Sequence, residues 1–235
     1  MSQQYPNNIT TARAQELTNV FLRGVYAWMS AGLAVTAAVA YFTASSEAML
    51  NLIFGNNIAP IALMIGWFVL GMGLGPMVPR LSAGAATGAF LLFSAVTGLM
   101  FSSIFIVYTM SSIASTFVIT AGMFGAMALY GAITKRDLTG MGSFMTMGLI
   151  GLILVMIVNI FLKSEPLHYA IGAIGVIIFA GLTAYDVQKL RNMGLSAPYD
   201  DATAIRRGTI LGALTLFLDF INLFLMLLRL FGDRR

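Results

Sequence analysis

The stretch TLFLDFINLFLMLL, residues 215–228, decides how this chain can fold. It is almost wholly apolar, and with its flanks it reaches the roughly 20 residues that a helix needs to cross a bilayer. Asp219 nevertheless lies well inside it. A charged side chain at the bilayer centre costs about 2.5–3.5 kcal/mol on insertion scales, so Asp219 requires a partner, water or a proton. The fold must therefore supply a group that faces this carboxylate.

Composition assigns the whole chain to the polytopic helical membrane proteins. Of its 235 residues, 59% are hydrophobic and 9% are charged, whereas soluble domains have about 45–50% and about 25%. No polar block is long enough to fold separately, so we expect a polar cytoplasmic tail over residues 1–20 and one transmembrane domain over residues 21–235. The net charge of +4 comes from basic residues that flank apolar runs, so nucleic acid is not an expected partner. The absence of cysteine excludes disulfides and thiol chemistry.

Apolar runs predict an all-α bundle of seven membrane-spanning helices. Polar or proline-containing segments separate these runs, and the longest such segment lies between the sixth and the seventh. Glycines also recur four residues apart, as in Gly71–Gly75 and Gly84–Gly88, which favours close helix packing within the bundle over a dimer interface. The expected spans are 22–43, 51–75, 83–107, 112–133, 142–162, 168–190 and 208–232.

The basic residues predict a cytoplasmic N-terminus, because Lys and Arg concentrate on the inner side of membrane proteins. Seven full crossings would then place nine of them inside and four outside, with the C-terminus outside. A re-entrant last segment would instead return the three C-terminal arginines to the inner side, but the length of the last apolar run favours a complete crossing. The inner residues are Arg13, Arg23, Arg80, Lys135, Arg136, Lys189, Arg191, Arg206 and Arg207, and the outer ones are Lys163, Arg229, Arg234 and Arg235.

Two carboxylates fall at membrane depth, Asp186 and Asp219, and both belong to the last helical hairpin. At 1.5 Å per residue, Asp186 lies about 8 Å and Asp219 about 12–18 Å from the inner ends of their expected helices. The levels differ by about one helical turn, so the side chains can meet directly or through one water. Two carboxylates this close in a dry site cannot both ionise cheaply and tend to share one proton. Such a pair is a pH sensor.

Basic and polar residues near this pair are candidates to complete the site. Arg80, at the inner end of the second span, is the first candidate for a counter-charge, and Arg23 is the second. Lys189 follows Asp186 by three residues and can pair with it on one helix face.

Calcium is the metal that such oxygen ligands suit. It takes six to eight oxygens, whereas two aspartates supply four at most. Tyr185, Asn222, carbonyls and water would have to add the rest, so Asp186 and Asp219 would form a weak calcium site, of the kind that suits a permeation path. No cofactor is expected, and calcium would be a transported ion. His168, the single histidine, is interpreted as an interfacial residue.

Simpler structural interpretations of both aspartates remain open. Asp186 could be a surface carboxylate at a helix end, held by Lys189. Asp219 could be a structural residue that is hydrogen-bonded to Asn222, to Thr215 or to nearby backbone. Intramembrane acids are functional candidates by default, which favours the proton-sharing hypothesis.

Several other classes of membrane protein are disfavoured. An intramembrane aspartyl protease would use two aspartates as general acid and base, but Leu216-Phe217-Leu218 stands where such enzymes carry glycines before the second aspartate. We therefore do not expect an enzyme. The last span has no lysine for a retinal Schiff base, and no phosphate-binding glycine-rich loop followed by lysine indicates an ATP-driven pump.

Five blocks of the sequence resemble the bacterial branch of the transmembrane Bax inhibitor motif family. The likeness extends over nearly the whole chain after the tail. The blocks are LMFSSIF (99–105) after Thr97-Gly98, AGMFGA (121–126), TKRDL (134–138), AYDVQK (184–189) and LDFINLF (218–224).

This resemblance implies a bundle in which six helices surround the last one. It also implies a pH-sensitive calcium leak in the bacterial inner membrane, governed by a di-aspartyl pair that matches Asp186 and Asp219. An arginine of the second helix latches one aspartate in the family, and Arg80 is its match here. Some bacterial relatives act instead through a cytoplasmic tail on a membrane AAA protease. A regulatory partner of such a protease or of a stress pathway, without ion transport, is therefore the alternative function.

Overall fold

The computed structural model describes residues 11–235 and the side chains from residue 13 onward. Within this part the chain is all-α, and seven of its helices are long and apolar enough to cross a membrane, as predicted. The elements are α1 (Thr11–Ala44), α2 (Glu47–Phe54), α3 (Ile58–Met77), the 3-10 turn η1 (Val78–Arg80), α4 (Ala83–Val107), α5 (Met110–Ile133), α6 (Thr139–Leu162), α7 (Glu165–Leu195) and α8 (Ala202–Phe231).

The N-terminal helix is longer than the bilayer requires. At 1.5 Å per residue, the 34 residues of α1 extend about 51 Å, against a hydrocarbon core of about 30 Å. The helix thus continues through residues 11–20, the second half of the expected tail. Residues 1–10 of that tail lie outside the described residues.

The second span begins later than the sequence predicted. We expected it from residue 51, but residues 51–54 end the separate short helix α2, and the spanning helix α3 begins at Ile58. Asn56 explains this restart, because its Oδ1 accepts hydrogen bonds from the backbone N–H groups of Ile58 and Ala59 at 2.9 and 2.7 Å. A side chain that satisfies the free N–H groups of a first turn favours a helix start at that point.

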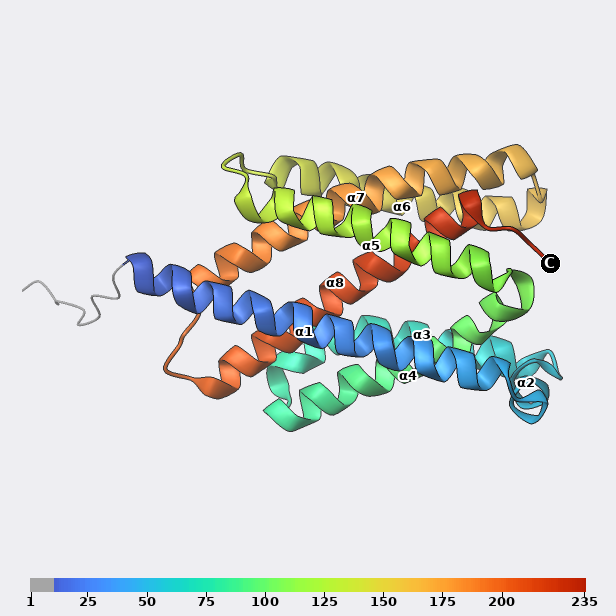
Figure 1. Ribbon diagram of the computed structural model, residues 1–235, viewed down its shortest axis with the longest axis horizontal. Helices are drawn as coiled ribbons and strands as arrows, with labels where there is room; N and C mark the ends of the chain where they lie inside the picture. The colour runs from blue at the N-terminus through green and yellow to red at the C-terminus, as the bar shows by residue number, and fades with distance from the viewer. Residues whose placement is uncertain (1–10) are drawn as a thin grey trace, which may run out of the picture.

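The two ends of the described chain lie at opposite ends of the bundle (Figure 1). The start of α1 shares its end with the α3–α4, α5–α6 and α7–α8 connections, while the C-terminus lies with the α4–α5 and α6–α7 connections. Helix α8 therefore crosses the bundle completely, and the re-entrant alternative for the last segment is wrong.

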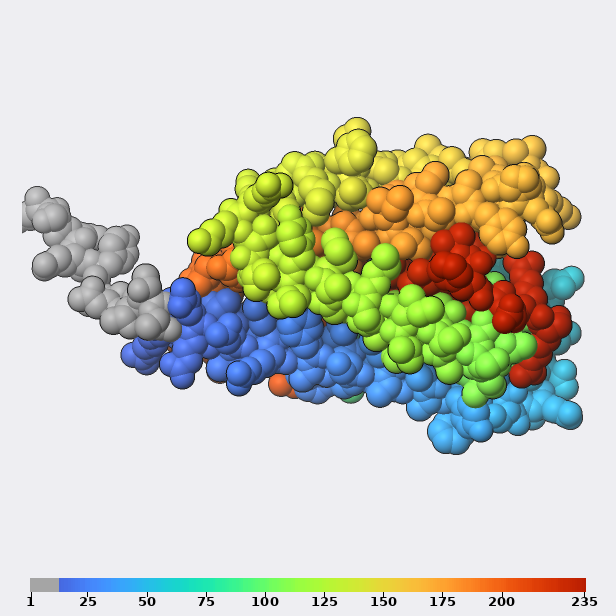
Figure 2. Space-filling model, turned by 45° about the horizontal axis from the view of Figure 1, so that its top comes forward, coloured from blue at the N-terminus to red at the C-terminus, as the bar shows by residue number. Residues whose placement is uncertain are grey.

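Helices α7 and α8 form the centre of the bundle. Of the most apolar window in each helix, 72% is buried in α8 and 61% in α7, against 6% in both α3 and α6. Figure 1 shows α8 running obliquely through the bundle, and in Figure 2 the helices around it cover most of its length, with its C-terminal end emerging. The central position expected for the last helix is confirmed, and it places Asp219 in the interior.

Close helix contacts occur at glycines other than those that the sequence pattern singled out. Gly75, Gly84 and Gly88 have no atom within 4 Å of where a Cβ would lie. The expected packing role is therefore wrong for these three. Gly71 alone of the four meets a neighbour, the ring of Phe93 at 3.3 Å. A spacing of four residues marks one face of a helix, but it does not tell whether that face meets protein or lipid.

The glycines that do allow close approach bring α4 onto α1 and α5 onto α7. A Cβ at Gly98 would lie 2.6 Å from the backbone oxygen of Thr36. A Cβ at Gly131 would overlap the backbone oxygen of Ala184, two residues before Asp186. The second contact fixes the backbone of α7 beside the candidate site.

Candidate functional site

The register between α7 and α8 brings the two aspartates together. Three glycine contacts along the hairpin set this antiparallel register: Gly172 with Leu230, Gly175 with Met226 and Gly212 with Leu190. When this register is extended along the part of the hairpin between these contacts, Asp186 lies within one helical turn of Asp219. This is the difference in level that the sequence predicted. The helices run further than expected, to Leu195 and from Ala202, but their relative register is unaffected.

The carboxyl groups of Asp186 and Asp219 lie within hydrogen-bonding reach of each other. Asp219 is 6% exposed and Asp186 is half-buried. In the described part of the chain, no group donates a hydrogen bond to Oδ2 of Asp219. Two ionised carboxylates are acceptors only, so a hydrogen bond between them requires one proton held in common. The approach of the two carboxyl groups is close enough for a proton to be shared between them.

The side chains suggested as structural partners of Asp219 bond elsewhere. The side-chain amide of Asn222 donates to the carbonyl of Leu218 at 2.8 Å, and the Thr215 hydroxyl donates to that of Leu211 at 3.1 Å. Neither group donates a hydrogen bond to Asp219. No lysine or arginine nitrogen among the described side chains lies within 4.0 Å of either aspartate.

Lys189 lies near enough to Asp186 to interact with its charge, but it forms no ion pair with it within 4.0 Å among the described side chains. Its Nζ lies 5.9 Å from the centroid of Tyr185, a cation–π arrangement, and the side chain is exposed. Tyr185 itself is half-buried and packs against Gly142 of α6, where a Cβ would overlap the ring. These two residues thus border the pair on the α6 side.

Arg80 does not reach the pair in this conformation. It is exposed at the end of η1, a turn that begins with Val78-Pro79 after α3 has ended. Nε of Arg207 donates to the carbonyl of Leu81 at 2.6 Å, which places this turn beside the start of α8. Asp219 follows Arg207 by twelve residues, about 18 Å along the helix. Arg23, the second candidate, is also exposed.

Gln188 is a residue of the site region that sequence reasoning missed. Its side chain is 8% exposed. Oε1 accepts a hydrogen bond from the backbone N–H of Leu138 at 2.8 Å, and Nε2 donates to the carbonyl of Arg136 at 2.7 Å. Gln188 therefore ties α7 to the α5–α6 connection one half-turn beyond Asp186. The sequence carries no local signal for this role, because both hydrogen-bond partners lie about fifty residues earlier in the chain.

Metal ligands are sparse around the pair. Residues 11–235 contain no group of three or more histidine, aspartate or glutamate side chains placed to hold a metal ion. The pair itself supplies at most four of the six to eight oxygens that calcium takes. A calcium ion at this pair would have to take its remaining oxygens from backbone or water.

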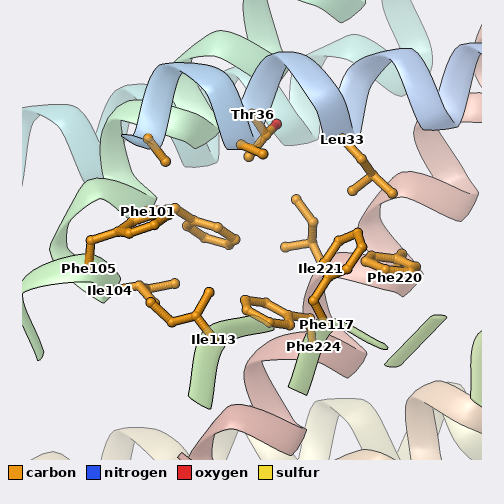
Figure 3. Close-up of a pocket in the computed structure, with 12 residues that line it drawn as sticks. Leu33, Thr36, Phe101, Ile104, Phe105, Ile113, Phe117, Phe220, Ile221 and Phe224 are labelled. Carbon is orange, nitrogen blue, oxygen red and sulfur yellow. The ribbon is translucent and has the colours of Figure 1, made fainter. Parts of the chain in front are cut away.

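A small apolar pocket lies elsewhere on α8. It has a volume of about 90 Å³ and lies among α1, α4, α5 and α8 (Figure 3). Phe117, Phe220 and Phe224 line one side and Phe101 the other, and Thr36 supplies the polar side chain. No titratable group lines it, so it offers no acid–base or ion chemistry.

A seven-helix bundle with carboxylates facing each other from its two most buried helices defines a polytopic membrane protein with an intramembrane acid pair. Residues 18–235 match the family described as "Inhibitor of apoptosis-promoting Bax1". The chain belongs to this family, as the five sequence blocks predicted.

Similar proteins come from distant bacteria. The inner membrane protein YbhL of Escherichia coli is 53% identical over 232 residues, which cover 99% of both chains. An uncharacterized protein of Borreliella burgdorferi is 44% identical over 96% of this chain and 97% of its own. The uncharacterized protein YrjE of Lactococcus lactis is 34% identical over 96% of each. With the seven apolar helices, these likenesses make the chain a multi-pass inner membrane protein.

Proposed function

We propose that this protein is a pH-sensitive cation leak channel, with calcium as the transported ion, gated by protonation of Asp186 and Asp219. The observation that carries the proposal is the close approach of two carboxylates in the bundle, with no ion pair to either within 4.0 Å among the described side chains. An arrangement that needs a proton to be stable responds to the proton concentration.

The shared proton holds the gate closed. While it is present, one carboxyl donates to the other and α7 stays against α8. Asp219 is 6% exposed, and its helix neighbours Phe217, Phe220 and Leu223 are at most 4% exposed, so the Asp219 side of the pair is shielded from water, while Asp186 is half-buried. In the proposed cycle, the close approach of the two carboxyl groups belongs to the closed, protonated state.

Loss of the proton at higher pH opens the gate. Two unit charges 4 Å apart repel by about 4 kcal/mol at an effective dielectric constant of 20. An energy of that size shifts a two-state equilibrium by about a thousandfold, since 1.4 kcal/mol is a factor of ten. The pair then separates or takes up a cation, which is either a passing calcium ion or the guanidinium of Arg80. Because Arg80 is about 18 Å of helix away, the latch requires the α3–α4 turn to move.

Calcium flux into proteoliposomes at controlled pH tests this proposal. Flux through the unmodified protein is expected to fall as the pH drops from 8 to 6. Asp186→Asn and Asp219→Asn each remove the shared proton and are expected to flatten this response. Asp200→Asn removes an exposed carboxylate from the α7–α8 connection and keeps the response. Unchanged pH dependence in both pair variants would falsify the gate.

Arg80→Gln tests the latch separately. The latch contributes only when the pair is deprotonated, so this variant is expected to change the flux at pH 8 and to leave it unaltered at pH 6. Equal effects at both pH values would show that Arg80 acts elsewhere.

The orientation with a cytoplasmic N-terminus, favoured by nine basic residues against four, is part of the proposal. The alternative function, regulation of a membrane AAA protease or a stress pathway, depends on the tail, of which residues 1–10 lie outside the described structure. Deletion of residues 2–10 distinguishes the two functions: loss of a cellular phenotype with intact calcium flux would favour regulation. We also propose that the pair has no hydrolytic role, and cleavage of a transmembrane peptide that stops in Asp219→Asn would contradict this.

A further inference from the structure

A polar cavity lies at the C-terminal end of the bundle, away from the acid pair. It has a volume of about 650 Å³ and lies between the α6–α7 connection and the end of α8. Three basic side chains line it against two carboxylates, which leaves an excess of one positive charge. These are Lys163, Arg229 and Arg234, with Glu165 and Asp233, and His168 lies among them.

The basic side chains of this cavity have no carboxylate partner. No ion pair within 4.0 Å is found among the described side chains. Arg229 is half-buried, and Nη2 of Arg234 lies 3.3 Å from Nε2 of His168. Lys163 and Arg234 are exposed, whereas a half-buried guanidinium such as that of Arg229 is stabilised by a nearby anion. With Glu165 and Asp233 counted, the cavity keeps one unbalanced positive charge.

The C-terminal segment is held in place, so this charge is fixed. The N–H of Asp233 donates to Oγ of Ser112 at 2.9 Å, and its carbonyl accepts from the N–H of Thr109 at 3.1 Å. The N–H of Arg235 donates to the carbonyl of Val107 at 3.0 Å. These bonds fasten residues 233–235 to the α4–α5 connection and hold Arg234 over the cavity.

An apolar crevice continues from this cavity into the membrane. It has a volume of about 480 Å³ and shares Arg229 and His168 with the polar cavity. From Arg229 it follows α8 past Leu225 to Asn222, seven residues or about 10 Å. Trp67 and Phe68 of α3 line one wall, and Leu149, Ile153 and Met156 of α6 line the other. Helices α3 and α6 are the least buried in the bundle, so the crevice lies among the helices most exposed to lipid.

We propose that the cavity and the crevice together bind one anionic phospholipid from the leaflet at the C-terminal end of the bundle. The phosphate lies against Arg229 and Lys163, since guanidinium and ammonium groups bind phosphate oxygens strongly. An acyl chain occupies the crevice, and headgroup hydroxyls donate to Glu165 and Asp233. A soluble anion would leave the crevice unfilled, and a zwitterionic lipid would leave the excess positive charge unbalanced. The apolar pocket of Figure 3 has no basic residue on its wall and does not meet these requirements.

Quenching of Trp67 by brominated lipids measures this binding. The chain has two tryptophans, and Trp28 stacks against Arg206, whose Cζ lies 4.4 Å from the ring centroid. In a Trp28→Phe background, Trp67 in the crevice wall is the sole reporter. Phosphatidylcholine vesicles would carry a dibrominated phosphatidylglycerol, phosphatidylethanolamine or phosphatidylcholine at equal mole fraction. We expect phosphatidylglycerol to bind at least threefold more tightly than either of the other two.

Charge variants at the two ends of the bundle distinguish specific lipid binding at the cavity from nonspecific contact with the bilayer. Lys163→Asn with Arg229→Gln is expected to bring the threefold preference to one. Asn suits position 163 because Lys163 has φ 50°, a left-handed conformation that asparagine tolerates. Lys135→Gln with Arg136→Gln removes the same charge at the opposite end and is expected to keep the preference. If Arg229→Gln does not fold, Lys163→Asn with Arg234→Gln replaces it, with the same expectation.

Three results would overturn the proposal. The first is equal quenching by the three lipids. The second is a phosphatidylglycerol preference that survives in the Lys163/Arg229 variant. The third is weak quenching by every lipid in a chain that sediments as a dimer, which would show that a second copy covers the crevice. None of these readouts depends on calcium flux, so the lipid site and the proposed gate can fail independently.

Discussion

The backbone N–H of Leu138 donates to Oε1 of the buried Gln188 at 2.8 Å, which binds the α5–α6 connection to α7. We predict that Gln188→Met, which keeps the length of the side chain, destabilises the fold. It leaves the N–H of Leu138 and the carbonyl of Arg136 without their partner, at about 1–3 kcal/mol for each buried group. The thermal midpoint in detergent should fall by several degrees.

Asn192→Met is the matched control for this variant. Asn192 lies one turn further along α7, is exposed and makes no side-chain hydrogen bond within the described chain. Its replacement should leave the midpoint unchanged. Equal thermal midpoints for the two variants would mean that the two hydrogen bonds of the Gln188 side chain do not stabilise the fold.

Gly131→Ala is predicted to force α5 away from α7. The added Cβ would overlap the carbonyl of Ala184, and backbone cannot yield as a flexible side chain does. Gly122→Ala on the same helix meets no atom within 4 Å and should be stabilising by about 0.5–1 kcal/mol, because alanine is the better helix former. The thermal midpoint should therefore fall in Gly131→Ala and rise in Gly122→Ala. Because Ala184 lies two residues before Asp186, Gly131→Ala should also alter the pH response of the calcium flux. A stabilised Gly131→Ala would contradict the contact.

The features that the sequence predicted correctly are those set by local composition. Seven apolar runs are long enough to span, and the register of a short hairpin follows from residue counting, so the level of Asp186 relative to Asp219 could be derived. The last helix was placed in the centre by resemblance, and the burial of α8 agrees with it.

The features that it missed depend on partners far away in the chain. The sequence around Gly131 and Gly84 does not show that Gly131 packs against the backbone of α7, whereas Gly84 has no neighbouring atom within 4 Å of its Cβ position. Gln188 could be recognised only from the carbonyl and the N–H group fifty residues earlier that it binds. Arg80 was placed by motif, but Pro79 turns the chain at that point, and the side chain is exposed in this conformation.

Asp137, in the α5–α6 connection, is predicted to make a pH-dependent contribution to stability. Its Oδ1 accepts hydrogen bonds from the side-chain hydroxyl of Thr139 at 2.6 Å and from its backbone N–H at 2.9 Å, which lower the pKa of Asp137 below its ordinary value of 3.8. A lowered pKa stabilises the fold above about pH 4 and less so as the pH falls through the folded value. Asp137→Asn should therefore have a lower thermal midpoint than the unmodified chain at pH 7, and the difference should shrink toward pH 3. A difference that is constant over this range would exclude a role for the charge.

The shared proton predicts the opposite pH dependence for the acid pair, which can be measured without any ion flux. In the proposed closed state Asp186 and Asp219 hold one proton between them, whereas independent aspartates of an unfolded chain are ionised above about pH 5. The folded state then binds more protons, so stability falls as the pH rises, with a slope of up to about 1.4 kcal/mol per pH unit. Asp219→Asn keeps the hydrogen bond through its amide and needs no proton, so its midpoint should be nearly constant between pH 5 and pH 8. The unmodified chain and Asp200→Asn should both lose stability over that range. If the curve of Asp219→Asn runs parallel to theirs, the two carboxyl groups do not share a proton.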